Sequence, residues 1–155
     1  FYIIININNI KMVLFESGVM LVGGKIFSNI INDTSVKVVN IVETALVHNH
    51  TDVHELFTEL DLDVRLAVIN SLIKNIKKEH SNETVNICLK SLYDVITNIN
   101  KITHDIDDII EEHKQKYFSG WRQIDVDSQI GEVRKQSDLL EKRFSLLINI
   151  VNIEN

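Results

Sequence analysis

An uninterrupted heptad pattern over residues 85–109 constrains the fold of this chain more than any other feature of the sequence. Apolar residues recur every seven positions, and a second apolar series follows the first at a distance of three positions. The first series is Val85, Leu92, Ile99 and Ile106, and the second is Cys88, Val95, Ile102 and Ile109. On an α-helix the two series form one apolar seam, which is stable only when a partner helix covers it. The pattern therefore predicts a helix from about residue 82 to Phe118 that has a helical partner.

The C-terminal part of the chain supplies a candidate partner. Over residues 126–151 a mostly apolar series alternates steps of four and three residues, which is helical spacing. Its positions are Val126, Ile130, Val133, Ser137, Leu140, Phe144, Leu147 and Val151. Joined through "SGWRQID", residues 82–151 are predicted to form a long antiparallel helical hairpin of coiled-coil type. The sequence leaves open whether this hairpin closes within one chain or swaps between two chains.

The scarcity of helix-breaking residues extends the helical prediction to the rest of the chain. The 155 residues include no proline and only five glycines, so long helices are not interrupted and tight turns are few. A chain of this length buries enough surface for one domain. We predict a single all-α domain, a helical bundle with N-terminal helices over residues 13–80 and the hairpin over 82–151. Residues 1–12 are an extension of uncertain structure, whose Ile/Asn alternation also fits a short edge strand.

Two segments before residue 50 have helical patterns. Residues 13–31 carry an apolar stripe, which the pair Gly23-Gly24 weakens because each interior glycine costs about 0.5–1 kcal/mol relative to alanine. Residues 35–48 are apolar on most sides, which predicts a buried helix. Their β-branched content leaves a strand as the alternative.

Polar residues mark the expected starts of the next three helices. Asp52 is expected to cap a short helix, with Glu55 three positions later, and Asp61 is expected to cap a helix over residues 62–78. Ser81 or Asn82 is expected to cap the long helix that carries the heptads.

His48, His50 and His54 place half of the chain's six histidines within seven positions. His50 and His54 are four residues apart, the spacing at which helical zinc sites place two imidazoles on one face, and His48 offers a third ligand. However, the segment spans an expected helix break, where Asp52 serves as a cap. We therefore predict a solvated junction with no metal and no other cofactor. The alternative is a metal-binding protein or metal-dependent enzyme that uses the three histidines.

The segment "HDIDDIIEEH" at residues 104–113 holds two histidines and five carboxylates. It lacks the Glu-x-x-His motif of di-iron helices. Because Ile106 and Ile109 lie in the seam, we expect the carboxylates on the solvated side of the helix. His113 continues the first heptad series, which predicts a buried or register-setting histidine.

An aromatic cluster lies at the expected hairpin tip. Tyr117, Phe118 and Trp121 fall within five positions, and Arg122 follows the chain's one tryptophan. Large aromatics usually bury their surface within their own domain, which predicts a seal at the end of the bundle. Because Trp, Tyr and Arg are enriched in binding hot spots, these four residues are also the candidate partner-binding site.

No feature of the sequence names a reaction. The chain has no Gly-rich phosphate loop, nucleophile elbow or catalytic Cys/His pair, so we predict no catalytic residues and no enzyme. The net charge of −6 argues against nucleic-acid binding. Lys11, Glu16 and Lys25 interrupt the apolar N-terminal region, which makes a membrane-spanning helix unexpected.

The preferred function is a non-enzymatic one. We predict a helical protein for protein–protein interaction or assembly, which binds a protein partner or associates with itself as a homo-oligomer. The frequent Ile and Asn and the scarce Ala and Gly indicate an AT-rich genome, such as that of a large DNA virus or of an AT-rich protist. An intracellular, cytoplasmic location is expected, or a virion-associated one if the source is viral.

Overall fold

The structure is a computed structural model that describes residues 3–7, 10–14, 19–76, 82–116 and 124–153, with side chains from residue 25 onward. A short hairpin comes first, made of β1 (Ile3–Ile7) and β2 (Ile10–Leu14). The helices that follow are α1 (Val19–Val47), α2 (Thr51–Leu60), α3 (Leu62–Asn75), α4 (Glu83–Lys114) and α5 (Asp127–Ile153). The predicted all-α bundle is confirmed.

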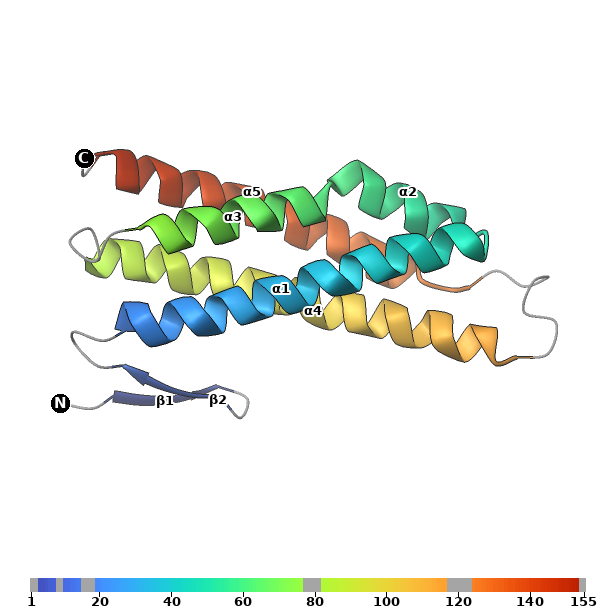
Figure 1. Cartoon of the computed structure of the whole chain (residues 1–155), viewed down its shortest axis with the longest axis horizontal. Coiled ribbons are helices and arrows are strands. Elements are labelled where there is room, and N and C mark those ends of the chain that lie inside the picture. Colours follow the sequence, from blue (N-terminus) through green and yellow to red (C-terminus); the bar gives the residue numbers. More distant parts are fainter. Residues whose placement is uncertain (1–2, 8–9, 15–18, 77–81, 117–123, 154–155) are drawn as a thin grey trace.

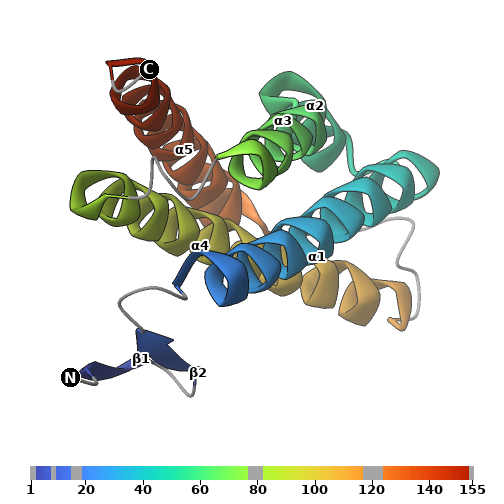
Figure 2. The ribbon, with the colours of Figure 1, turned by 60° about the vertical axis from the view of Figure 1, so that its left-hand side comes forward.

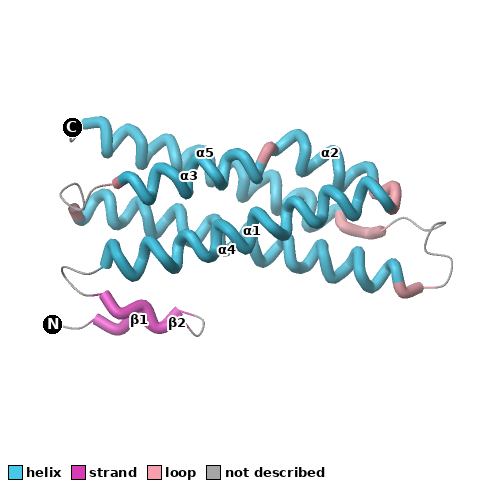
Figure 3. Tube along the Cα trace, viewed as in Figure 1, coloured by secondary structure: helices cyan, strands magenta, loops and turns pink. Residues whose placement is uncertain are grey.

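The bundle is organised around α4, which packs against α1 on one side and α5 on the other. Figure 1 shows α4 and α5 running in opposite directions, and α2 and α3 following one another back along α1. The same arrangement is visible after rotation in Figure 2. Figure 3, coloured by secondary structure, separates these helices from the hairpin beside the N-terminal end of α1.

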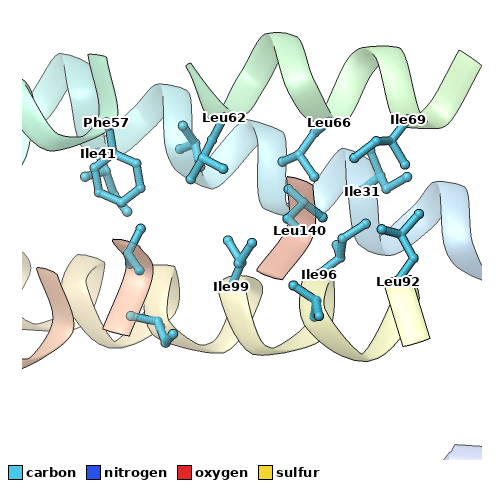
Figure 4. Packing of buried hydrophobic residues seen from close by; sticks show 14 of the residues in the cluster. Ile31, Ile41, Phe57, Leu62, Leu66, Ile69, Leu92, Ile96, Ile99 and Leu140 are labelled. Carbon is cyan, nitrogen blue, oxygen red and sulfur yellow. The ribbon is translucent and has the colours of Figure 1, made fainter. Parts of the chain in front are cut away.

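Aliphatic side chains from the helices fill the core. In Figure 4, Ile31 and Ile41 of α1 face Leu92 and Ile99 of α4 across the interior. The other labelled side chains that share this space are Phe57 of α2, Leu62, Leu66 and Ile69 of α3, Ile96 of α4 and Leu140 of α5. All of these residues are at most 2% exposed, so the core is continuous along the bundle.

The heptad positions of α4 are buried, as predicted, with one exception, but the buried face is wider than a two-helix seam. The first series, Val85, Leu92, Ile99 and Ile106, is fully buried, and Ile109 of the second series is only half-buried. Ile96, Thr103 and Ile110, which lie four positions after members of the first series, are fully buried as well. The antiparallel hairpin is therefore present, whereas its coiled-coil type is not confirmed, because α1 covers α4 in addition to α5.

One continuous helix, α1, replaces the two segments expected before residue 50. It begins at Val19 rather than at residue 13, and it passes through Gly23-Gly24. Residues 35–47 are helical, so the strand alternative is wrong. Helix α1 continues through residues 32–34, where the hydroxyl of buried Thr34 donates to the carbonyl oxygen of Ile30 at 2.7 Å and is therefore satisfied within the helix.

Two of the three predictions of helix caps are wrong, because the side chains named do not cap the helices. His50, not Asp52, is the N-cap of α2, and Asp52 lies inside the first turn. Asp61 does stand at the N-cap of α3, but its left-handed backbone (φ 49°) joins α2 to α3 and its side chain caps nothing. Asn82 is confirmed as the cap of α4, since its side-chain oxygen accepts from the backbone N–H of Val85 at 2.9 Å.

The N-terminal extension contains a β-hairpin. Its strands pair antiparallel from Ile3 with Leu14 to Ile7 with Ile10. The Ile/Asn alternation thus did mark a strand, and Val13 belongs to β2 rather than to a helix.

Candidate functional site

The histidine-rich segment folds into the junction between α1 and α2, at one end of the bundle. The backbone N–H of His50 donates to the carbonyl oxygen of Ala45 at 2.8 Å, which turns the chain back at the end of α1. This turn places the ring of His50 against that of His113 in the last turn of α4. The ring centroids lie 5.4 Å apart with the planes at 72°, and the two residues are 9% and 8% exposed.

Each imidazole of this pair has a ring nitrogen that lacks a hydrogen-bond partner. The Nε2 atoms of His50 and His113 are both buried, and neither has a hydrogen-bond partner. Burial lowers the pKa of His50 below 6.5, and the neighbouring charges of His113, His48 and Lys114 lower it further. The arrangement therefore favours an uncharged His50.

The three histidines considered as metal ligands do not converge. The ring of His48 lies 6.3 Å from that of His50, while His48 is exposed and His54 is half-buried. Across the part of the chain that the structure describes, no group of three or more His, Cys, Asp or Glu residues could hold a metal ion. The metal-dependent alternative thus has no structural support. The junction is otherwise solvated, as predicted: His48, Asn49, Thr51 and Asp52 are exposed, and His50 is the buried residue among them.

A line of polar contacts joins α1 to α4, and sequence reasoning missed it. Asn100 donates to the carboxylate of Asp33 at 2.8 Å, and His104 lies 3.4 Å from the same oxygen. The hydrogen bond from Asn100, followed by the interactions with His104, lowers the pKa of Asp33. One turn further along, Lys37 pairs with Asp107 at 2.6 Å. No signal in the sequence points to these pairs, because their members lie 67 to 71 residues apart.

Most of the carboxylates at 104–113 face solvent, as expected. Asp105, Asp108, Glu111 and Glu112 are exposed. Asp107 is the exception, because it is half-buried in the ion pair with Lys37. His113 is buried, as its heptad position predicted.

Tyr117, Phe118, Trp121 and Arg122 lie outside the described residues, so their partner-binding role stays a prediction. Helix α4 ends at Lys114, before the expected end at Phe118.

The outward side of α1 carries exposed apolar side chains. Val36, Val39, Leu46 and Val47 are 60%, 42%, 64% and 74% exposed. The expectation that residues 35–48 are buried on most sides is therefore wrong. Only one side of this part of α1 faces the core, through Val38, Ile41 and Ala45.

Comparison with known proteins gives one relationship to report. The chain is 29% identical over 94 residues to "Uncharacterized protein L717" of Acanthamoeba polyphaga mimivirus. The alignment covers 60% of this chain and 45% of the relative, so the chain matches less than half the length of that viral protein. No protein-family model and no solved structure matches the chain.

A search of the described helices for a span that could cross a membrane finds none.

Proposed function

We propose that this chain is a non-enzymatic assembly protein of viral origin, which associates through the surfaces of its helices. The observation that carries the proposal is the set of exposed apolar residues on α1, namely Val36, Val39, Leu46 and Val47. Single exposed apolar residues are ordinary on a soluble protein, whereas several on one helix mark an interaction surface. The similarity to a mimivirus protein and the AT-rich composition support a viral source.

The histidine contact favours a binding role over a metal-dependent enzymatic one. In the described residues, His50 and His113 have no third His, Cys, Asp or Glu with which to hold a zinc ion. The polar groups between α1 and α4 pair with each other, as structural ion pairs do.

Sedimentation equilibrium of the full chain over a hundredfold range of concentration tests this proposal. We expect the average mass to rise with concentration, because association follows mass action. A mass equal to that of a single chain at every concentration would contradict the proposed assembly role.

A further inference from the structure

Two opposite charges lie on either side of Val36 and Val39, two of the exposed apolar residues of α1. Lys25 and Glu43 are both exposed, and they lie 18 residues apart. Eighteen residues are five turns of an α-helix, so the two side chains leave α1 in the same direction, about 27 Å apart. Val36 and Val39 lie between them and are 60% and 42% exposed.

Within the part of the chain that the structure describes, neither Lys25 nor Glu43 pairs with another side chain. In the described residues, no ion pair or side-chain hydrogen bond involves Lys25 or Glu43. The other ion pairs that reach α1 lie on its inner flank, where Asp33 and Lys37 meet α4. The outward charges of α1 are thus available to a partner.

The spacing of these charges is self-complementary. If two copies of α1 pack antiparallel about a two-fold axis near residue 34, Lys25 of each copy lies opposite Glu43 of the other. The axis then passes about 3 Å along the helix from Val36, so the two copies of Val36 lie near the centre, and Val39 lies farther out on either side. A two-fold interface uses the same patch on both chains, as such pairs of charges at both ends require.

We propose that the outward face of α1 binds a second copy of this chain in an antiparallel, two-fold arrangement. Val36 supplies the apolar centre with Val39 on either side of it, and two equivalent Lys25–Glu43 pairs fix the register. This inference rests on the proposed assembly role and names the surface that would carry it. Because exposed ion pairs give modest energies and the apolar patch is small, the association is weak and sensitive to salt.

Charge reversal tests the register directly. Lys25→Glu and Glu43→Lys each replace two attractive contacts by two repulsive ones, so each is expected to raise the dissociation constant roughly tenfold at low salt. The double variant K25E/E43K restores both attractive pairs, and we expect it to recover dimer formation. Lys101→Glu, at an exposed position of α4, is the matched control that changes the net charge without touching the face.

A second pair of variants tests the apolar centre. Val36→Ser is expected to weaken association, whereas Val64→Ser, at a 51% exposed position of α3, is expected to leave it unchanged. Both sites are exposed, so neither variant is expected to unfold the chain.

The outcomes separate the two proposals. If the parent dimerises but the double charge reversal is no better than the single variants, this interface is wrong and the assembly role stands. If the parent is monomeric at all concentrations, both proposals fail.

Discussion

Ile99 in the middle of α4 and His113 near its end occupy the same heptad position, and both are buried. Ile99 faces the aliphatic core, where burial removes apolar surface from water and costs no hydrogen bond. His113 instead faces His50, and the Nε2 atoms of both rings are buried without a hydrogen-bond partner. From this comparison we expect equal burial along one helix to stabilise the fold at its centre and to weaken it at its end.

The largest effect is expected in the middle of α4. Ile99→Asp would bury an unpaired carboxylate, which costs several kcal/mol, comparable with the whole stability of a small domain. Thermal melts followed by circular dichroism should show a severe loss of stability. Asp108→Ala, on the exposed side of the same helix, is the control and should change the melt little. If the melt of the Ile99→Asp variant matches that of the parent, burial of Ile99 does not stabilise the fold.

At the end of α4 we expect a substitution to increase the stability of the fold. His113→Leu replaces an unsatisfied polar group by an aliphatic one, and leaving such a group buried costs about 1–3 kcal/mol. We therefore expect a higher midpoint of urea unfolding at pH 7.5. His104→Leu is the control, because His104 is half-exposed, lies near Asp33, and should give no such gain. If His113→Leu lowers the midpoint, the His50–His113 contact stabilises the fold.

A smaller effect on stability is expected to depend on pH, because His50 is buried at the end of the bundle. Burial lowers the pKa of folded His50 below its ordinary value of 6.5, so the unfolded chain binds a proton more readily than the folded one. The stability that depends on neutral His50 is thus complete above about pH 6.5 and decreases as the pH falls through the lower pKa of the folded state.

His50→Gln should remove this part of the pH dependence, as measured by melting temperature between pH 7.5 and 5. His54→Gln, one turn further along α2, is the matched control. Parallel pH profiles for the parent and the His50→Gln variant would show that His50 does not contribute.

Much of the bundle could be predicted because the periodicity of apolar residues is a local property of the sequence. The spacing from Val85 to Ile109 specified α4 and its buried face, and the series from Val126 to Val151 specified α5. Asn82 could be predicted as a cap because its oxygen bonds a backbone N–H only three residues away.

The candidate surfaces were harder to predict. Residues 35–47 have apolar residues on several sides, and the pattern alone could not tell which side another helix covers. The structure buries Val38 and Ile41 and leaves Val36 and Val47 exposed, because α2, α3 and α4 leave one side of α1 uncovered.

The sequence by itself determined that this protein is helical, where α4 and α5 lie and most of the residues of these two helices that face inward. Only the tertiary structure decided that α1 runs unbroken past Asp33, whose side chain bonds Asn100 of α4. It also decided that His50 meets His113 rather than a metal. The physical reason is the range of the interactions: helical periodicity repeats every few residues, whereas these contacts join side chains 63 to 67 positions apart that meet only when the helices pack.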